Sequence, residues 1–270
     1  MSDLRAQIEA ANLTPFQRLV LLFQILRSPE GCAWDRKQTH QSLVPYLIEE
    51  AYEVVEAIEA GNPSDLSEEL GDLLTQVIFH AQLASEAGEF NIDDTITGVV
   101  TKLVNRHPHV FGEKKDLNPK QVRDQWEKIK TTSGEKESVL SGLPRTMPAL
   151  TMAFRIGEKA GGVGFDWQNP ADVVAKLDEE LQEVKNEMMV SQPSQEKLAD
   201  EIGDLLFATA SLARKLEIDP EVALRKALAK FRARFDKLED RVRQSGKNFD
   251  SFSLEQLEEY WQQLKADQSS

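Results

Sequence analysis

The sequence predicts an all-α protein built from two related helical-bundle domains in tandem. Apolar residues recur at spacings of three and four, as on one face of a helix, in the run Val173, Leu177, Leu181, Val184 and Met188. No convincing alternation of period two, which would indicate strands, accompanies them. An acidic spacing also occurs twice, with the second copy 130 residues after the first, so the chain divides into two related units.

Capping residues indicate where several helices begin. A residue suited to capping the first helical turn stands directly before a proline at Asn62-Pro63, Asn169-Pro170 and Asp219-Pro220. Ser253-x-x-Gln256 is typical of a capping box before a final helix. These signals predict helix starts in both halves of the chain.

A polar segment, residues 131–138, separates the two units. It contains a glycine, and Gly142, Pro144 and Pro148 interrupt the sequence that follows. We therefore predict three consecutive parts, an N-terminal domain, a linker and a C-terminal catalytic domain, at residues 1–135, 136–148 and 149–270.

Composition favours a soluble protein with packed cores. Of the 270 residues, 40% are hydrophobic and 29% are charged, as in ordinary globular domains. The longest apolar run, Leu19 to Phe23, is far too short to cross a bilayer, and the N-terminus lacks the pattern of a secretory signal. The single cysteine, Cys32, cannot form an internal disulfide. We expect a cytoplasmic protein without a membrane partner.

The net charge of −14 argues against binding to nucleic-acid polymers and to anionic membranes, because both are repelled at long range. A small polyanion such as a nucleotide can still bind if it arrives with a divalent cation. It then also needs a local group of Lys and Arg side chains.

The repeated acidic pattern predicts two metal sites. Its first copy comprises Glu49-Glu50-x-x-Glu53 followed by Glu69-x-x-Asp72, and its second comprises Glu179-Glu180-x-x-Glu183 followed by Glu201-x-x-Asp204. Residues three apart share a helix face, so two antiparallel helices can bring the acids of one copy together. Close carboxylates raise one another's pKa and destabilise a fold unless a hard cation such as Mg²⁺ neutralises them. The pattern therefore indicates one site at Glu180, Glu183, Glu201 and Asp204, and a second candidate site at Glu50, Glu53, Glu69 and Asp72.

A solvated helix face is the alternative interpretation, since Glu on an amphipathic helix usually lies there. Asp178, Glu179 and Glu187 fit that description. A metal site is favoured because ExxE is paired with ExxD across a short loop and both keep the same placement beside an apolar stripe.

Helical geometry describes that placement. With about 100° per residue and Leu177 at the centre of the apolar stripe, Glu180 falls about 60° and Glu183 about 120° to one side, with Lys176 between them. The following helix repeats the arrangement with Lys197, Glu201 and Asp204.

The repeat extends beyond the acids. Trp34-Asp35 precedes Glu50 by about the same distance as Phe165-Asp166-Trp167 precedes Glu180. Downstream, Lys102-x-x-x-Arg106 and Trp126 correspond to Lys230-x-x-x-Arg234 and Trp261. Trp34, Phe165 and Trp167 can pack at a contact between helices or between subunits, and we expect core positions for all three. General grounds alone favour the core for Trp261 as well.

These residues resemble the MazG family of nucleoside triphosphate pyrophosphohydrolases, an all-α group whose hallmark is an EExxE run followed by ExxD. The resemblance covers nearly the whole chain, including both acidic copies, Leu143-Pro-Arg-Thr-Met-Pro-Ala-Leu150 and Gly164-Phe-Asp-Trp167. It implies two tandem MazG-like helical-bundle domains and a homodimer. An exposed acidic hairpin would also bury little surface alone, which independently favours oligomerisation.

The resemblance further implies an enzyme that uses Mg²⁺ to hydrolyse a nucleoside or deoxynucleoside triphosphate between its α and β phosphates. The products would be the monophosphate and pyrophosphate, and the role would be to clear aberrant or regulatory nucleotides. The family's metal ligands match Glu180, Glu183, Glu201 and Asp204. Its nucleotide contacts match Lys176, Lys197, Lys230, Arg234 and Trp261.

Each of these matches suits its role physically. Lys176 and Lys197 flank the acids and can meet phosphate oxygens, while Arg234, four residues after Lys230, can hold a phosphate through two parallel hydrogen bonds. For Trp261 the resemblance alone favours base stacking over a core position. Either Glu180 or Glu183 could take the proton of an attacking water.

The first unit keeps the acids but not the lysines. Tyr46 stands in the position of Lys176, and Asp65 stands in the position of Lys197. We therefore expect the second unit to be the working site. The first unit is then regulatory or weakly active, helps to form the dimer, or acts on a different nucleotide, and the sequence leaves these options open.

Two other functions remain open at the sequence level. One is a nucleotide- or metal-binding regulatory protein with little turnover, and the other is a purely structural helical interaction protein. The lysines of the second unit favour the enzyme, because simple cation binding would not need them.

Overall fold

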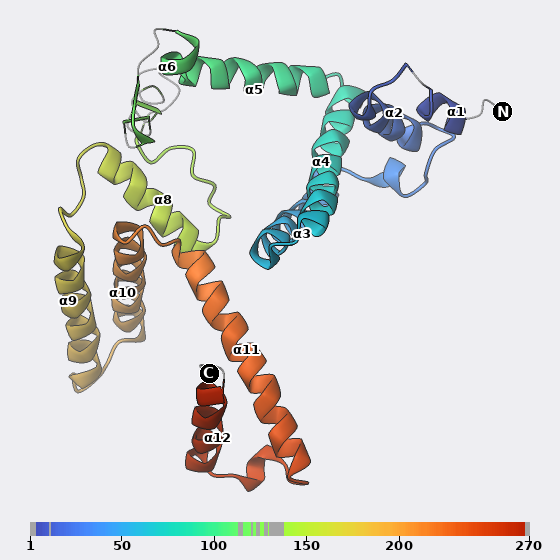
Figure 1. The fold of residues 1–270 in the computed structure, drawn as a ribbon. Helices are drawn as coiled ribbons and strands as arrows, with labels where there is room; N and C mark the ends of the chain where they lie inside the picture. Colours follow the sequence, from blue (N-terminus) through green and yellow to red (C-terminus); the bar gives the residue numbers. More distant parts are fainter. Residues whose placement is uncertain are drawn as a thin grey trace. The chain divides into compact units, whose positions relative to one another are not determined.

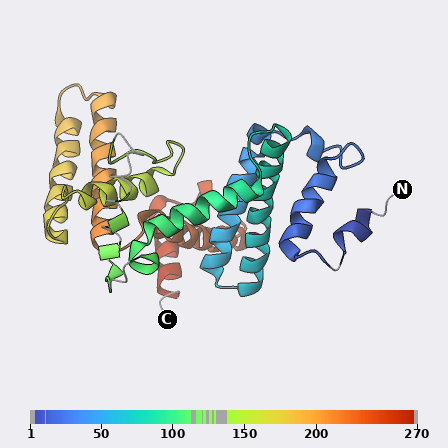
Figure 2. The same ribbon diagram turned by 90° about the horizontal axis from the view of Figure 1, so that it is seen from above.

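The computed structural model describes residues 4–10, 12–112 and 138–267, together with positions 116–119, 121, 122, 125, 126 and 129. All regular elements in these residues are helical, which confirms the predicted all-α class. The chain folds into two compact units, the first spanning Met1–Asp116 and the second Leu117–Ser270. Figures 1 and 2 show the helices of each unit. No helix in the described ranges is long and apolar enough to cross a membrane.

The first unit is organised around an antiparallel helical hairpin. Its described elements are α1 Leu4–Ile8, α2 Pro15–Arg27, the 3-10 turn η1 Asp35–Lys37, α3 His40–Ala60, α4 Pro63–Glu86, α5 Ile92–Arg106 and α6 Pro108–Phe111. Helices α3 and α4 lie side by side, and α2 packs on α4 (Figure 1). Asn62 caps α4 directly before Pro63, as predicted, by accepting a hydrogen bond from the backbone N–H of Ser64.

The core of the first unit lies between α2, α3 and α4. Phe23, Leu43, Ile78 and Phe79 form a buried cluster, in which the rings of Phe23 and Phe79 lie 5.0 Å apart. Arg27 at the end of α2 also forms an ion pair with Glu86 at the end of α4, with an N–O distance of 2.6 Å. Apolar contact and this ion pair together fix α2 against the hairpin that carries the acids.

The second unit contains a corresponding hairpin. Its described elements are α8 Ala149–Gly162, α9 Pro170–Met189, α10 Gln195–Lys215, α11 Pro220–Gln244, the 3-10 turn η2 Phe249–Ser251 and α12 Leu254–Asp267. Helix α9 packs on α10, α8 packs on α10 and α11, and α11 packs on α12 (Figure 1). The predicted caps are confirmed, because Asn169 and Asp219 accept hydrogen bonds from the first turns of α9 and α11.

The capping box before α12 is confirmed as well. The backbone N–H of Ser253 donates to Gln256 Oε1 at 3.0 Å, and the backbone N–H of Gln256 donates to Ser253 Oγ at 3.4 Å.

The loop between α8 and α9 is fixed to α10 by charge. Asp166 accepts hydrogen bonds from both terminal nitrogens of Arg214, at 3.0 and 2.6 Å, and from Lys215 at 2.7 Å. Gly157 on α8 provides the space for this contact, since a Cβ there would lie 2.5 Å from Arg214 Nε. A small residue in α8 thus allows the arginine to reach the loop.

The predicted inward face of α9 is partly wrong. Val173 and Val184 are buried at 0% and 7% exposure, but Leu181 and Met188 are exposed at 41% and 63%. Helix α10 covers the side of α9 that carries Glu180, which is 4% exposed. The helix is therefore rotated toward its acidic edge, and part of its apolar stripe remains on the surface of the unit.

The expectation that the aromatic residues lie in cores is wrong for two of them. Trp34 is 50% exposed and Phe165 is 82% exposed, whereas Trp167 is half-buried.

The predicted limits of the domains and the linker stay a prediction. The two compact units meet earlier in the sequence, between Asp116 and Leu117. Much of the predicted boundary, including residues 131–137, and part of the repeated segment after Trp126 lie outside the described residues.

Candidate metal centre

Three carboxylates of the second unit converge between α9 and α10. Glu180 and Glu183 come from α9 and Glu201 comes from α10, and one oxygen of each lies within 4.8 Å of the others. The convergence follows from the sequence, because two acids three residues apart share an edge of α9 and the adjacent antiparallel helix presents the third. Glu180 is buried, Glu201 is half-buried and Glu183 is exposed, so the group opens to solvent on one side.

Lys176 lies directly beside this group. Its Nζ atom is 2.6 Å from Glu180 Oε1 and 2.9 Å from Glu179 Oε1. Hydrogen bonds to Glu180 and Glu179 raise the pKa of Lys176, so the ammonium stays charged near the carboxylates. Position 176 therefore supplies a positive charge one helical turn before the buried acid.

The chemistry of the group fits a hard divalent cation. Loss of hydration and the negative charges of Glu180 and Glu201 raise the pKa of Glu183. The second oxygen of Glu180, Oε2, is buried without a hydrogen-bond partner among the described residues. All the ligand atoms are carboxylate oxygens, which Mg²⁺ prefers, and a bound cation would compensate both the repulsion and the unpaired oxygen.

The other predicted site residues lie outside this group of three oxygens. Asp204 and Lys197 are exposed on α10. Lys230 and Arg234 lie on α11, which packs on α8, α10 and α12. Trp261 lies on α12 with its ring 4.9 Å from that of Phe231, so it takes part in the aromatic contact between α11 and α12.

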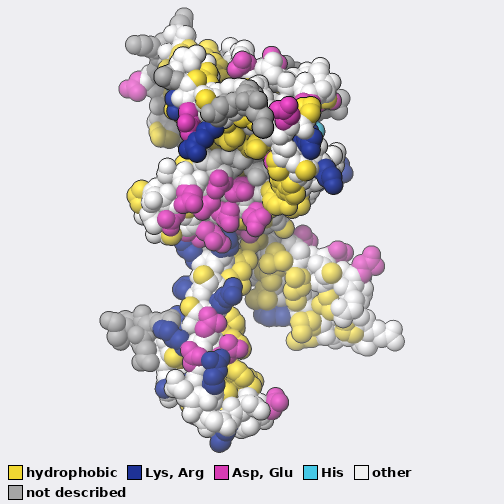
Figure 3. Space-filling view, turned by 90° about the vertical axis from the view of Figure 1, so that its right-hand side faces the viewer, with side chains coloured by type: hydrophobic (Ala, Val, Ile, Leu, Met, Phe, Trp, Pro, Cys, Tyr) yellow, Lys and Arg dark blue, Asp and Glu magenta, His cyan; other side chains and the backbone are white. Residues whose placement is uncertain are grey.

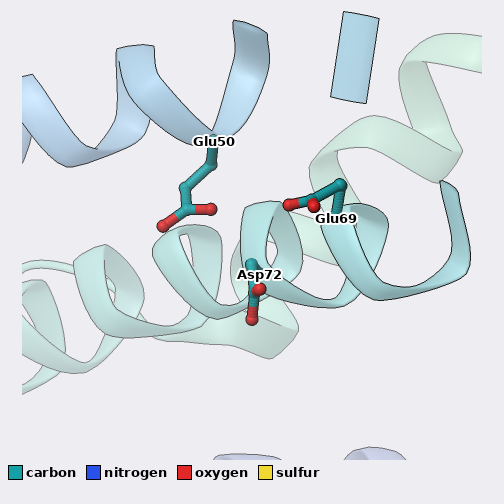
Figure 4. Close-up of side chains that lie close together, drawn as sticks. All are labelled: Glu50, Glu69 and Asp72. Atoms are coloured by element: carbon teal, nitrogen blue, oxygen red, sulfur yellow. The ribbon is translucent and has the colours of Figure 1, made fainter. Parts of the chain in front are cut away.

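The first unit contains a second group of carboxylates. One oxygen each of Glu50, Glu69 and Asp72 lies within 4.8 Å of the others. Figure 4 shows Glu50 reaching from α3 toward α4, which carries Glu69 and Asp72. The fourth predicted acid, Glu53, is not in the group. In the space-filling view of Figure 3, Asp and Glu side chains, coloured magenta, gather on part of the surface in view.

Mutual repulsion is evident in the first unit too. Burial, followed by the charges of Asp72 and Glu53, raises the pKa of Glu50. Burial and then the charges of Glu53 and Asp72 raise the pKa of Glu69. Glu53 therefore acts on the group electrostatically although its oxygen is not among the three.

Gln76 is a member of the first site that the acidic pattern did not reveal. It is 8% exposed, and its Nε2 atom donates to Glu50 Oε1 over 3.5 Å. Its Oε1 atom is buried without a hydrogen-bond partner in the described part of the chain. The available signal was its position, because Gln76 follows Asp72 by four residues on the same edge of α4.

Comparison with known proteins supports the interpretation of the two hairpins as two copies of one domain. The family model for the MazG nucleotide pyrophosphohydrolase domain matches residues 38–111 and again residues 168–239. A relative from Thermotoga maritima named nucleoside triphosphate pyrophosphohydrolase/pyrophosphatase MazG is 49% identical over 93% of this chain and 95% of its own length. A nucleoside triphosphate pyrophosphohydrolase from Escherichia coli is 44% identical over 94% of this chain and 98% of its own length.

The fold and the two acidic groups thus define a tandem all-α protein with two candidate centres for divalent cations. The chain belongs to the MazG nucleotide pyrophosphohydrolase family. The predicted family, the helical class and the enzyme class are confirmed. The family model matches the chain twice in succession, as a tandem repeat requires.

Proposed function

We propose that the second unit hydrolyses nucleoside triphosphates, including deoxynucleoside triphosphates, to the monophosphate and pyrophosphate. The observation that carries this proposal is the convergence of Glu180, Glu183 and Glu201, one of them buried, beside a lysine. The names of the relatives supply the substrate class. In the cytoplasm, such an activity would remove aberrant or regulatory nucleotides.

Glu180, Glu183 and Glu201 would hold Mg²⁺, with Asp204 on the next turn of α10 as a fourth ligand. The bound ion would supply charge neutralisation on the phosphates and a lowered pKa for a coordinated water. Glu183, whose side chain is exposed, would take the proton from the attacking water. Glu180 is the other candidate for this role.

The remaining predicted residues would bind the substrate. Lys176 and Lys197 would neutralise phosphate oxygens at the edges of α9 and α10. Lys230 and Arg234 lie four residues apart on α11 and would hold the phosphate chain, and Trp261 would contact the base.

We also propose a homodimer. Exposed apolar side chains remain on the helices that carry the second site, namely Leu181, Met188, Ile202, Leu206 and Phe207 on α9 and α10, and Leu224, Leu228 and Phe231 on α11. Figure 3 likewise shows broad areas of exposed hydrophobic side chains. A second copy covering these faces would bury apolar area that one chain leaves in water. It could also bring a basic face of α11 to the acids of its partner.

Two substitutions test the catalytic proposal. Glu180→Ala and Asp204→Ala should each abolish pyrophosphate release while the helical content measured by circular dichroism stays nearly unchanged. The exposed neighbours offer matched controls, because Asp178→Ala and Asp200→Ala remove the same charge from the same helices. Full activity in either site variant, or equal losses in the controls, would refute the assignment.

A second function is favoured for the first unit by a specific observation. Tyr46 and Asp65 replace the lysines of the second unit, so the acids of the first unit lack neighbouring positive charge at both positions. We propose that the N-terminal domain binds metal and nucleotide with little turnover, and that the C-terminal domain at 149–270 is catalytic.

A further inference from the structure

A cluster of ion pairs, here called the Asp166 brace, holds the segment before α9 against the end of α10. Both oxygens of the Asp166 carboxylate accept hydrogen bonds from Arg214, at 3.0 and 2.6 Å, and Lys215 donates to the same carboxylate at 2.7 Å. Lys215 also donates to the backbone carbonyl of Trp167. The three charged side chains are only 11% to 21% exposed. Paired hydrogen bonds to one carboxylate fix both its distance and its orientation, so the segment is held in one position on α10.

The Asp166 brace closes the open end of the second acidic hairpin. Asp166 lies four residues before α9 begins, and Arg214 and Lys215 are the last two residues of α10. The loop of residues 190–194 joins α9 to α10 at the opposite end, and the two helices lie side by side (Figure 1). The carboxylates of the candidate cation site lie between these two attachments. Because the hairpin is fixed at both ends, α9 cannot shift along α10 without breaking the brace.

Small shifts within this hairpin matter because of the ion that the carboxylates would hold. Glu180 and Glu183 come from α9 and Glu201 comes from α10, and one oxygen of each lies within 4.8 Å of the others. Mg²⁺ requires nearly octahedral coordination with ligands at about 2.0–2.1 Å, whereas Ca²⁺ accepts longer bonds and more variable geometry. A displacement of α9 along α10 would therefore weaken the binding of Mg²⁺ more than the binding of Ca²⁺.

Helix α8 leaves space for the Asp166 brace at two glycines that lie one turn apart. A Cβ at Gly157 would lie 2.5 Å from Arg214 Nε, and a Cβ at Gly161 would lie 3.2 Å from Asp166 Oδ2. A glycine in the interior of a helix costs about 1 kcal/mol relative to alanine. Gly157 therefore weakens α8 locally but lets Arg214 reach the carboxylate.

The first acidic hairpin differs at the positions that correspond to the brace. When α4 is aligned with α10 by their acids, Gln82 and Leu83 take the places of the two cationic residues. A neutral amide and an aliphatic side chain cannot form ion pairs, and Gln82 donates to Glu86 on its own helix instead. The brace therefore belongs to the hairpin whose acids also have a neighbouring lysine.

We propose that Asp166 is a positioning residue for the cation site of the second unit. Its ion pairs with Arg214 and Lys215 fix the register of α9 against α10. That register keeps the two acids of α9 at the spacing from Glu201 that Mg²⁺ requires. The inference rests on the proposed cation binding by the second unit. It deepens that proposal by naming a residue outside the acidic pattern on which the spacing of the ligands depends.

The test measures cation binding by the full chain with Glu50→Gln and Glu69→Gln, which disable the candidate site of the first unit. Calorimetric titration of this parent with Mg²⁺ and, separately, with Ca²⁺ should show one site for each ion. Asp166→Asn keeps the shape of the side chain and removes its charge. It should weaken Mg²⁺ binding about tenfold, the lower end of the usual cost of losing support outside the ligands. Binding of Ca²⁺ should weaken less than about threefold, because Ca²⁺ tolerates a changed spacing.

Two further variants loosen the brace while Asp166 stays in place. Gly157→Ala puts a Cβ against Arg214 from α8, and Arg214→Lys keeps the charge but removes the paired hydrogen bonds. Each should weaken Mg²⁺ binding about threefold, since the carboxylate keeps part of its contacts, and should weaken Ca²⁺ binding by less.

Val242→Ala is the matched control for a loss of stability alone. Val242 is 3% exposed on α11 and lies next to Arg241, whose side chain contacts Gln263 on α12. Shortening this buried side chain lowers the free energy of unfolding without a change at the brace. The affinity for both ions should stay as in the parent. Chemical denaturation compares the stabilities, and circular dichroism should show the same helical content in all variants.

Equal Mg²⁺ affinity in the parent and in Asp166→Asn would overturn the positioning role. Equal losses for Mg²⁺ and Ca²⁺, or the same loss in Val242→Ala, would overturn it too, because a general loss of structure affects both ions alike. In these cases the parent would still bind Mg²⁺, so the proposed cation site would stand. Absence of Mg²⁺ binding in the parent would refute the cation site itself, and the inference with it.

Discussion

The two acidic hairpins share a pair of antiparallel helices with converging carboxylates but differ in the side chains one turn away from the acids. In the second hairpin Lys176 pairs with the buried Glu180. In the first, the corresponding neighbour is Tyr46, and the buried Gln76 reaches Glu50 instead. Both hairpins bring three carboxylate oxygens within 4.8 Å. The comparison indicates that the hairpin by itself brings the carboxylates together, whereas the side chains one turn away give the two candidate cation sites different surroundings.

The largest expected difference between the hairpins is catalytic. Glu180→Gln should reduce pyrophosphate release at least about 100-fold, because it removes a charged ligand of the cation that would stabilise the developing charge. Glu50→Gln should reduce it by less than about twofold, because the first hairpin lacks both lysines. Steady-state assays of the full-length variants with several nucleoside triphosphates give the comparison. Similar losses from the two substitutions would mean that the first unit shares in catalysis.

The local features of both hairpins could be predicted from the sequence because they depend on nearby residues. Asn62, Asn169 and Asp219 cap helices through contacts two or three residues away, and an adjacent proline reinforces each signal. The meeting of Glu180 with Glu201 also follows from helical spacing and a short connection. Helix caps and contacts between adjacent helices can therefore be predicted from a single sequence.

Features that depend on which helix covers which face could not be predicted in the same way. The periodicity placed Leu181 and Met188 inward, yet both are exposed, and Glu180 is buried instead. The face of α9 that is buried is set by its packing on α10. The apolar pattern of α9 alone contains no information about that packing. Gln76 was missed for a related reason, since an amide gives no acidic signal and only its burial beside Glu50 marks it.

The ion pairs that hold a neighbouring segment against each hairpin, Asp166 with Arg214 and Lys215 in the second unit and Arg27 with Glu86 in the first, give a second comparison with a smaller expected effect. Burial opposes ionisation of Asp166, but hydrogen bonds from Arg214 and Lys215 prevail and lower its pKa from 3.8 to about 2. Since one pKa unit corresponds to about 1.4 kcal/mol, Asp166→Asn should lower the free energy of unfolding by about 2 kcal/mol at pH 7. Chemical denaturation of the full chain measures this difference.

The sign of the pH dependence follows from the depressed pKa of Asp166. The folded state favours the carboxylate, so the stabilisation is fully present above about pH 4 and is lost as the pH falls toward 2. The difference between the unmodified chain and Asp166→Asn should shrink over this interval. In the first unit Glu86→Gln is the matched substitution, and it should cost less because the Glu86 side chain is 37% exposed, against 21% for Asp166. An equal or larger loss from Glu86→Gln would show that exposure does not set the strength of these two braces.

The smallest expected effect is a change in stability with pH that comes from a pair of histidines in the first hairpin. The Nδ1 atoms of His40 on α3 and His80 on α4 lie 2.7 Å apart, and the rings are nearly parallel. One Nδ1–H must donate to the other Nδ1, so the contact holds only while at least one ring is neutral. Burial, followed by the neighbouring His40, lowers the pKa of His80.

A lowered pKa means that the unfolded first unit binds a proton more readily than the folded one. The stability of this unit should therefore be level above about pH 6.5 and should fall as the pH drops below it. His80→Asn should cost about 1 kcal/mol at pH 7.5, as for one lost hydrogen bond, and should flatten the decline between pH 6.5 and 5. Scanning calorimetry of the full chain can follow the transition of each unit. If the stability of the first unit declines below pH 6.5 just as steeply in His80→Asn, its acid sensitivity arises from groups other than this histidine pair. The substitution removes only one titrating side chain, so all other titrating groups of the unit remain to cause the decline.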